Sequence, residues 1–458
     1  LRYALSFGKD GRLKAAREIG APSELQPGER YAVYAEERMQ CGDFYNGSAY
    51  LDTMNAEATD AFLHSTLDRY AEECGDLLGG AIRGVFTDEP YRGALFNGFS
   101  VGNANRSRMI PYTGKLFEAY REKYGEDLCV PEIYYGRTGE EDQETSARYI
   151  DVLDRLFVEN FGKRYADWCR RHGMILTGHI LHEDSLSIQT SLSGSMMRFY
   201  EVMDYPGIDN LTAHSPCYWA AIQCASAARQ LGKPFVLSEL YGCTGWDMPL
   251  REYKRIGDWH ALFGINLRCP HLSWYTMEGE AKRDYPTSIL HQNAWYRDWK
   301  ILEDHFARVG LILTEGRRRA ELLVVHPVEQ MWKLVRKGWM DVFTPGDERI
   351  SELDGQFIGQ CMELIESQHE FDYGDEELLA KYGSVGRDEA GTFLRVGEAV
   401  YRTVLLRDGQ QIRSSTEELL RAFRKQGGKI CSSAGELSAA EVRSAPPHIA
   451  SAVREWGG

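Results

Sequence analysis

Two acidic strand ends carry the residue types that hydrolytic acid–base chemistry needs. In "GVFTDEPYRG" (84–93), Asp88 and Glu89 follow an apolar run and precede Pro90, which places them at the tip of a buried strand. Glu239 ends another apolar run in "VLSELYG" (236–242). Cleavage of a glycosidic bond needs one carboxyl that protonates the leaving oxygen and one that attacks or activates water. Glu89 and Glu239 are therefore the predicted catalytic pair; a salt-bridged turn acid and a buried ion pair are the structural alternatives.

Histidine and aromatic residues follow similar strand ends and extend the candidate site to substrate binding. Neutral imidazoles can hydrogen-bond sugar hydroxyls or orient a carboxylate, and aromatic rings can stack on the apolar faces of sugars. Each of these residues also has a structural alternative, a satisfied histidine or a core ring. The predicted substrate-binding set is Asp88, His179, His214, Tyr241, Trp246, His271, Trp274, Tyr275 and Glu278.

Metal chemistry has little support in the sequence. The loop "MEGE" holds Glu278 and Glu280, which could join the site or coordinate a cation, but exposed loop acids need no function. No H-E-x-x-H motif occurs, and "HILHED" spaces His179 and His182 three apart on a strand-to-loop segment. We therefore predict no metal ligands and no required cofactor.

Regular alternation of helices and strands must position these residues. Apolar residues recur at helical spacing in 56–75, 147–172 and 251–264. Five short apolar runs each end in polar or ionisable groups: 82–90, 173–180, 206–214, 234–242 and 265–274. Active sites of (β/α)₈ barrels lie at the C-terminal strand ends. The pattern therefore predicts a TIM-type barrel, with these runs as its last five strands.

The N-terminal part fits the alternation less well. "RYALSF" and "RYAVYAEERM" resemble the arms of a β-hairpin around a "QPGER" turn, and "SAYLDTMN" is expected to be the preceding barrel strand. Two strands would then be absent, which predicts a barrel truncated at its N-terminus. Residues 1–315 are predicted to form this barrel with its hairpin insertion.

Residues 316–458 are predicted to form a second, smaller α/β domain with an open sheet. Strands are expected at 319–327, 401–409 and "KICSS", with a helix over 415–428. No G-x-G-x-x-G or G-x-x-x-x-G-K-[ST] motif accompanies them, so packing or subunit contact is the expected role.

Composition excludes several classes of partner. The formal net charge of -15 argues against nucleic acid or an anionic membrane and favours a neutral or cationic substrate. No apolar run approaches the roughly 20 residues that span a bilayer. The ten cysteines form no C-x-x-C pair, so they are expected to be reduced, buried thiols of a cytoplasmic protein, although an export signal ahead of "LRYALSFGKDG" stays open.

The motifs also carry a family resemblance. "FTDEP", "SELYGCTGW", "HLSWYTMEGEAKRDYP" and "LLVVHPVEQMW" resemble the large bacterial α-L-rhamnosidase-like glycoside hydrolases and, more distantly, the barrel β-galactosidases. The resemblance implies Glu89 as acid/base on strand four and Glu239 as the second carboxylate on strand seven. It also implies a flavodoxin-like or glutaminase-like domain after the barrel. Asp88 stands where the β-galactosidases have an asparagine that holds the sugar 2-hydroxyl, which leaves the sugar and the stereochemistry open.

The resulting prediction is a hydrolase that removes a terminal sugar, with α-L-rhamnoside first, from an oligosaccharide, polysaccharide or glycoconjugate. The rhamnosidase-like enzymes are inverting and can bind calcium near the site. Three alternatives stay open: a retaining β-galactosidase-like enzyme, a non-catalytic carbohydrate-binding barrel, and a metal-dependent sugar isomerase or epimerase. The sequence predicts no oligomeric state.

Overall fold

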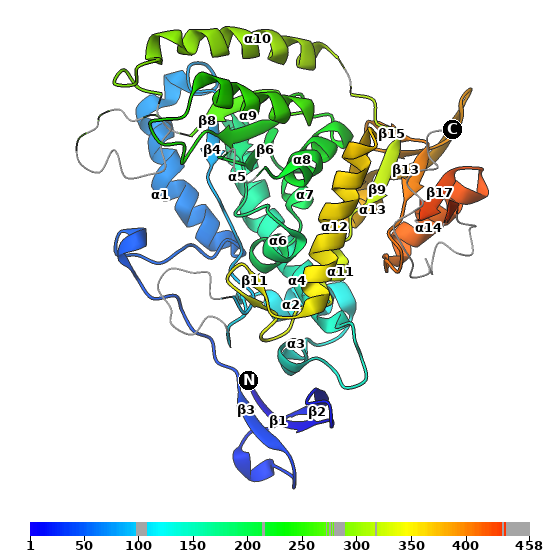
Figure 1. Ribbon diagram of the computed structural model, residues 1–458. Helices are drawn as coiled ribbons and strands as arrows, with labels where there is room; N and C mark the ends of the chain where they lie inside the picture. The colour runs from blue at the N-terminus through cyan, green and yellow to red at the C-terminus, as the bar shows by residue number, and fades with distance from the viewer. Residues whose placement is uncertain are drawn as a thin grey trace.

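The computed structural model describes residues 1–97, 108–212, 216–271, 273, 276, 278, 289–316, 318–432 and 435–436. Its centre is a five-stranded parallel sheet, which we call the half-barrel (Figure 1). The strands lie in chain order: β4 (Gly84–Thr87), β5 (Ile175–Gly178), β6 (Tyr205–Asp209), β7 (Leu237–Leu240) and β8 (Leu267–Pro270). The five strands predicted at 82–90, 173–180, 206–214, 234–242 and 265–274 are therefore confirmed, as is the α/β barrel type of fold.

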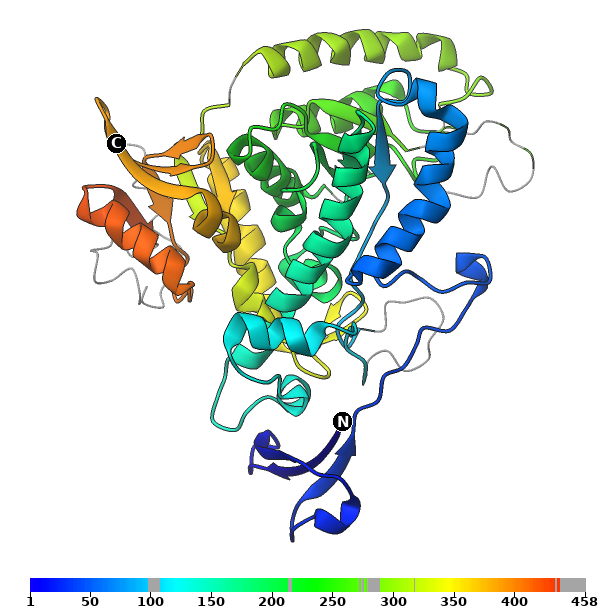
Figure 2. The same cartoon turned by 180° about the vertical axis from the view of Figure 1, so that it is seen from behind.

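Helices precede, connect and follow the strands of the half-barrel along the chain, and several of them lie against it (Figure 2). They are α1 (Ala56–Cys74), α2 (Leu116–Tyr124), α3 (Val130–Tyr135), α4 (Glu144–Phe157), α5 (Arg164–Arg171), α6 (Leu186–Leu192), α7 (Met196–Phe199), α8 (Tyr218–Gln230), α9 (Leu250–Leu262) and α10 (Trp299–Glu315). The predicted helix over 147–172 is confirmed, but a π-helical turn at Val158–Lys163 joins α4 to α5. Local signals start the helices: the Asn55 side chain accepts hydrogen bonds from two backbone N–H groups of α1.

The N-terminal prediction is only partly correct. The two predicted arms do pair, as β1 (Arg2–Phe7) and β3 (Arg30–Val33), but β2 (Leu13–Glu18) pairs with the other edge of β1. The result is a three-stranded antiparallel sheet instead of a hairpin. The expected strand "SAYLDTMN" is wrong: Asp52 accepts a hydrogen bond from the Met54 N–H, and Asn55 caps α1, so this stretch forms a turn.

A second sheet follows α10 and supplies the smaller α/β unit. Its order is β12 (Phe371–Gly374), β9 (Leu322–Val325), β16 (Thr403–Leu405), β17 (Lys429–Ser432) and β18 (Gly435–Glu436), with only β18 antiparallel. The surrounding elements are α11 (Val328–Trp332), β10 (Met340–Asp341), β11 (Thr344–Pro345), α12 (Glu348–Glu366), α13 (Glu376–Tyr382), β13 (Gly383–Asp388), β14 (Gly391–Val396), β15 (Ala399–Tyr401) and α14 (Ser414–Lys425). Its flavodoxin-like assignment and the boundary at 315/316 stay predictions.

The two sheets share one hydrophobic core. Alternate residues of β9 point to opposite faces: Leu322 and Val324 join the core of the half-barrel, whereas Leu323 and Val325 join a separate cluster with β16 and α14. Helix α8 packs against both β6 and β12. Both faces of the second sheet are therefore packed against hydrophobic residues, and helix α8 connects this sheet to the half-barrel by contacts with both.

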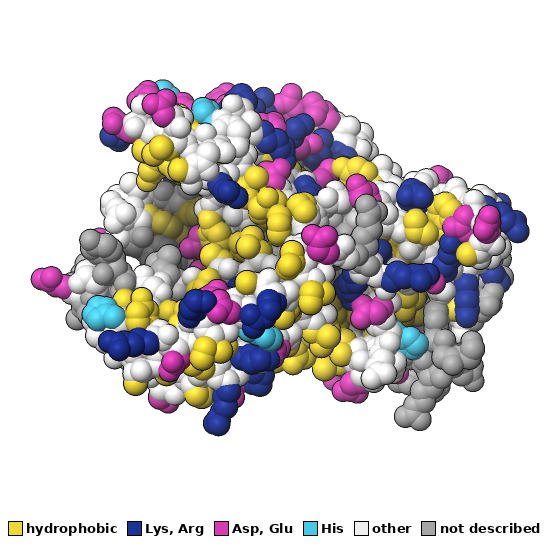
Figure 3. Space-filling view, turned by 90° about the horizontal axis from the view of Figure 1, so that it is seen from above, with side chains coloured by type: hydrophobic (Ala, Val, Ile, Leu, Met, Phe, Trp, Pro, Cys, Tyr) yellow, Lys and Arg dark blue, Asp and Glu magenta, His cyan; other side chains and the backbone are white. Residues whose placement is uncertain are grey.

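The surface of the described chain mixes charged and apolar side chains, as Figure 3 shows from the side on which α10 lies in Figure 1. None of the described helices is long and apolar enough to cross a lipid bilayer. All ten cysteines are free thiols, as predicted, but only five of them are buried, and Cys41 and Cys243 are exposed.

Candidate active site

Parallel strands bring the predicted acids and histidines to one edge of the half-barrel. Because β4 to β8 all run in the same direction, their C-terminal ends meet there. Each strand is followed or ended by an ionisable group: Asp88 and Glu89, His179, Asp209, Glu239, and His271. We call this set the strand-end cluster.

His179 and Glu239 form the closest contact of the cluster. The Nε2 atom of His179 lies 2.6 Å from Oε2 of Glu239 and 3.4 Å from Oδ1 of Asp88. The second oxygen of Glu239 lies 3.8 Å from Nε2 of His271. His179 is fully buried and the Glu239 side chain is 9% exposed, so this contact is shielded from water. The contact links the tips of β5 and β7 across β6.

Gly178 lets His179 reach this position. Gly178 has a φ of +123° at the end of β5, and a Cβ there would lie 2.0 Å from the carbonyl oxygen of Thr87 on β4. No other residue type fits so close to a neighbouring backbone. The glycine thus lets β5 approach the tip of β4 and sets His179 beside Asp88.

The His179 side chain is a buried imidazolium. Burial disfavours its charge, but the hydrogen bond to Glu239 and the nearby carboxylates of Glu183 and Asp209 outweigh burial and raise the His179 pKa to about 10. At neutral pH the Nε2–H therefore donates to Glu239 in a charge-assisted hydrogen bond.

Glu89 lies in an environment that favours the neutral form of its side chain. It is partly buried, and this desolvation raises the pKa of its carboxyl group, with Asp88 adding to the rise and His179 opposing it. Glu89 therefore holds its proton to higher pH than an ordinary glutamate. A pair of carboxyl groups in such different environments is the arrangement from which acid and base roles are assigned.

Two further acids have raised pKa values: Asp209, a member of the strand-end cluster, and Glu183, on the loop that follows β5. Burial raises the pKa of Asp209 to about 7, with Glu239, Glu89 and Asp88 adding to it, and it raises the pKa of Glu183 well above the ordinary range. Glu183 is only 3% exposed. The sequence places Asp209 at a predicted strand end but indicates no role for Asp209 or for Glu183. The available signal for Glu183 was its position in "HILHED" (179–184), which follows the end of a predicted strand.

Backbone strain gathers at this edge. Glu89 (φ +52°), His182 (+55°), Tyr241 (+77°) and Cys243 (+57°) are non-glycine residues in the left-handed region, and each follows a strand of the half-barrel within four residues. Each such residue costs roughly 1–2 kcal/mol. Strain of this kind clusters where a backbone must present side chains to a ligand.

The remaining predicted residues differ in position. Tyr241 is fully buried in an aromatic cluster with Tyr253 and Trp299, and its hydroxyl accepts a hydrogen bond from Arg268. Its ring is therefore part of the core and is not exposed to stack on a sugar. Trp246 is 43% exposed on the loop after β7, and Glu278 is exposed. Four predicted residues lie outside the described part of the chain: His214, Trp274, Tyr275 and Glu280.

One group in the described residues has the spacing of a metal site. Ligand atoms of Asp88, His179 and Glu239 lie within 4.8 Å of one another. The Nε2 atom of His179 that would face the ion lies 2.6 Å from Oε2 of Glu239, at hydrogen-bond distance. Calcium also prefers oxygen ligands alone. The group therefore fits an ion pair better than a calcium site.

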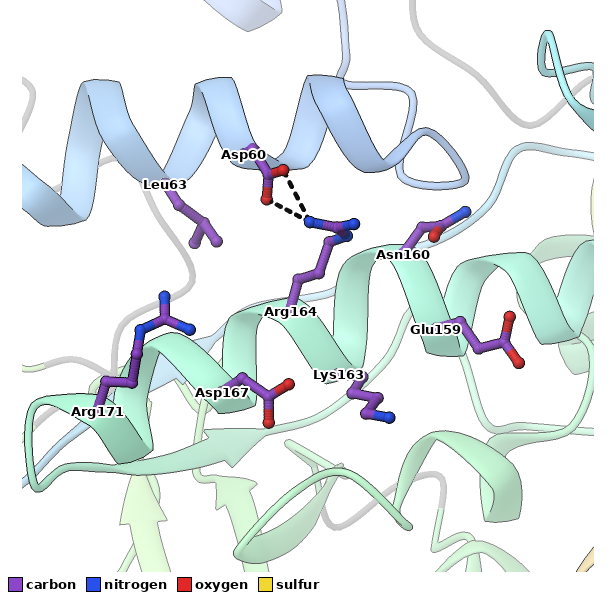
Figure 4. A pocket seen from close by; sticks show the side chains of 8 residues that line it. All are labelled: Asp60, Leu63, Glu159, Asn160, Lys163, Arg164, Asp167 and Arg171. Atoms are coloured by element: carbon purple, nitrogen blue, oxygen red, sulfur yellow. Dashed lines mark hydrogen bonds and ion pairs between the residues drawn. The ribbon is translucent and has the colours of Figure 1, made fainter.

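The hollow drawn in Figure 4 is a different feature. It lies between α1 and the π-helical turn with α5, and Asp60 pairs with Arg164 there at 2.7 Å. Basic and acidic side chains alternate along it, and it contains none of the strand-end cluster. We assign it no role in the site.

Comparison with known proteins supports the predicted resemblance. The chain is 24% identical over 285 residues to a protein of Formosa agariphila named "Putative beta-glucuronidase", a match that covers 60% of this chain and 22% of that protein. No protein-family model matches the chain.

Solved structures of glycoside hydrolases share the fold. A rhamnosidase from Novosphingobium sp. PP1Y has a TM-score of 0.62 at 17% identity over 86% of this chain. A GH42 exo-carrageenase from Bacteroides ovatus has 0.54 at 8% over 89%, and a β-galactosidase from Rahnella sp. R3 has 0.51 at 11% over 86%. The chain spans 35%, 58% and 57% of these proteins respectively. The resemblance to glycoside hydrolases with a barrel fold is thereby confirmed.

Proposed function

We propose that this chain carries the active site of a glycoside hydrolase, with Glu89 as general acid and Glu239 as the second carboxylate. One observation carries the proposal: burial raises the pKa of Glu89, whereas Glu239 accepts a hydrogen bond of 2.6 Å from a buried imidazolium. Two carboxyl groups in such different environments at the C-terminal edge of a half-barrel match what glycosidic cleavage requires.

The reaction follows from the roles proposed for Glu89 and Glu239. Glu89 gives its proton to the glycosidic oxygen while the bond to the anomeric carbon breaks, and the bond electrons leave with the departing alcohol. The Glu239 carboxylate either attacks the anomeric carbon or removes a proton from the water that does so. Water finally supplies the new hydroxyl of the sugar. His179 positions Glu239 and holds its charge through the hydrogen bond of 2.6 Å.

The first substrate to expect is a terminal α-L-rhamnoside. The rhamnosidase has a higher TM-score than the carrageenase and the β-galactosidase above, and the strand-end cluster carries several carboxyl groups that disfavour an anionic sugar. A β-galactosidase-like retaining enzyme is the second candidate, because the barrel β-galactosidases share the fold.

Calcium is not required in this proposal. Every step above uses a proton or an ionised carboxyl group of the chain itself. Asp88, the most exposed member of the cluster with a side chain 72% exposed, is proposed to hold a sugar hydroxyl.

A panel of nitrophenyl glycosides tests the proposal. The 458-residue chain is assayed on α-L-rhamnoside, β-D-galactoside and β-D-glucuronide, beside its Glu89→Gln and Glu239→Gln variants. We expect hydrolysis of at least one neutral glycoside and a loss on the order of 100-fold or more in Glu239→Gln. The loss in Glu89→Gln should be smaller on these substrates, because nitrophenolate departs with little need for a proton. Near-normal rates in Glu239→Gln would remove Glu239 from the catalytic pair. Silence of the wild-type chain across the panel, with sugar binding intact, would favour the non-catalytic carbohydrate-binding barrel.

A further inference from the structure

A short hairpin from the smaller α/β unit reaches back to the strand-end cluster. The strands β10 and β11 lie at the end of the half-barrel toward which β4 points (Figure 2). Trp339, just before β10, is fully buried and donates its Nε1–H to the carbonyl oxygen of Leu95 at 2.9 Å. Asn97 donates its side-chain amide to the carbonyl oxygen of Val342 at 2.7 Å. Both contacts fix the hairpin to the segment that follows Glu89.

The tip of this hairpin presents an aromatic ring. Phe343 is 45% exposed, and the residue before it, Val342, has a φ of +53°. A β-branched residue in the left-handed region is a true outlier, because its branched side chain clashes with its own backbone there. The hairpin thus holds a strained turn that projects Phe343 outward while its base stays anchored.

Phe343 contacts His182, which lies on the loop that follows β5. Its ring is 4.9 Å from the ring of His182, edge to face, and His182 Nδ1 is 3.1 Å from Asp184 Oδ2. The segment that holds His182 lies beside the segment that holds Glu89, because Leu181 donates its backbone N–H to the carbonyl oxygen of Pro90 at 3.4 Å. The charges of His182 and Glu89 accordingly shift each other's pKa. Phe343, His182 and Glu89 therefore follow one another along one side of the site.

We propose that Phe343 and His182 form the binding surface for the leaving group. A general acid must lie within hydrogen-bond reach of the leaving oxygen, so the leaving group occupies the Glu89 side of the scissile bond. This step rests on the proposed function. The chemistry of the surface then selects a leaving group with a flat apolar face that stacks on Phe343, either an aryl group or the apolar face of a second sugar ring.

Two leaving groups on the same sugar separate ring stacking from the rest of the site. The nitrophenyl glycoside carries a ring, whereas the trifluoroethyl glycoside is a reactive alkyl glycoside without one. In Phe343→Ala we expect kcat/KM for the nitrophenyl glycoside to fall about tenfold, and that for the trifluoroethyl glycoside to fall at most about threefold. Phe343→Trp should retain the ring preference. Tyr70→Ala, which removes an exposed ring from α1, is the matched control.

Equal losses on both glycosides, or no loss on either, would overturn the role of Phe343 while leaving the hydrolase intact. If the wild-type chain hydrolyses none of the glycosides, the proposed function fails independently of this inference. Isothermal titration calorimetry with nitrophenyl and methyl α-L-rhamnoside then tests whether Phe343 binds an aryl group. Tighter binding of the aryl glycoside that Phe343→Ala abolishes supports the surface. A preference that survives the substitution, or no binding of either glycoside, overturns it. A second test, with a nitrophenyl-free disaccharide in place of the aryl glycoside, shows whether a sugar ring stacks as well.

Discussion

His179 and Glu239 are joined through a contact of 2.6 Å that links strands β5 and β7 across the intervening β6. Because the histidine is buried and charged, the contact is an ion pair in a region from which water is excluded. Removal of one partner of a buried ion pair leaves an uncompensated charge, which costs far more than the pair itself contributes. The contact therefore fixes both the geometry and the charge of the site.

The first prediction concerns alkaline stability. The pKa of His179 is raised from 6.5 to about 10 in the folded protein. Its charge thus contributes stability that is fully present below about pH 6.5 and is lost as the pH rises through about 10. Urea denaturation at rising pH should show the wild-type chain losing more free energy of unfolding between neutral pH and pH values above 10 than His179→Gln. Parallel curves for the two proteins would contradict this.

Asp209 gives a pH dependence of the same sign in a lower pH range. Its pKa is raised from 3.8 to about 7, mainly by burial, so its contribution to stability is present below pH 3.8 and is lost as the pH rises through about 7. Asp209→Asn keeps the shape of the protonated form and cannot ionise. We expect this variant to have a higher Tm than the wild type at pH 8, with the difference shrinking at acidic pH. A lower Tm at pH 8 would show that the ionised Asp209 is stabilising.

Gly178 offers a test of how the backbone positions His179. A Cβ at Gly178 would meet the Thr87 carbonyl oxygen at 2.0 Å, whereas a Cβ at Gly391, which has a similar φ of +116°, meets nothing within 4 Å. Both substitutions to alanine introduce similar backbone strain, because the two φ angles are similar. Only Gly178→Ala also creates a clash, which should displace the tip of β5. We expect Gly178→Ala to lower kcat strongly and Gly391→Ala to leave it within about twofold. Equal effects on kcat would argue that Gly178 acts through strain alone.

A buried network outside the site predicts a large effect on stability. Arg198 contacts four carboxylates from both units: Asp151, Asp154, Glu329 and Asp375. Arg198→Met leaves these acids without their shared cation and should lower the free energy of unfolding by about 3–5 kcal/mol. Arg121→Met removes an exposed pair with Asp127 and should cost about 1 kcal/mol or less. Similar losses in the two variants, measured by chemical denaturation, would contradict the account.

Chelation tests the absence of a metal requirement. Overnight dialysis against EDTA should leave the hydrolysis rate unchanged, because the proposed steps use only protons and carboxyl groups of the chain. A loss of activity that a divalent cation restores would point to the group of Asp88, His179 and Glu239, and it would favour the metal-dependent alternatives.

The strands and helices that carry the site were predictable because their signals are local. Each strand of the half-barrel is a short apolar run that ends in an ionisable group, and each helix repeats apolar residues at three and four positions. The stretch 48–55 forms a turn instead of the predicted strand, because the side chains of Asp52 and Asn55 accept hydrogen bonds from backbone N–H groups that follow them.

Contacts between distant parts of the chain could not be predicted. The buried position of Tyr241 depends on Tyr253 and Trp299, and the exposure of Phe343 depends on anchors at Leu95 and Asn97. The raised pKa of Glu183 arises from its burial, which residue type and spacing do not show. Residue type and spacing indicated the catalytic pair, but the difference between the surroundings of Glu89 and Glu239 is a property of the folded chain.

The most direct test of the central claim compares leaving groups in the Glu89→Gln variant. A dinitrophenyl glycoside departs without protonation, whereas a methyl glycoside of the same sugar needs a proton from the general acid. If Glu89 is that acid, the variant should retain kcat on the dinitrophenyl glycoside within about tenfold and lose about 100-fold or more on the methyl glycoside. Equal losses on both substrates, or full activity on the methyl glycoside, would contradict the assignment of Glu89 as the proton donor.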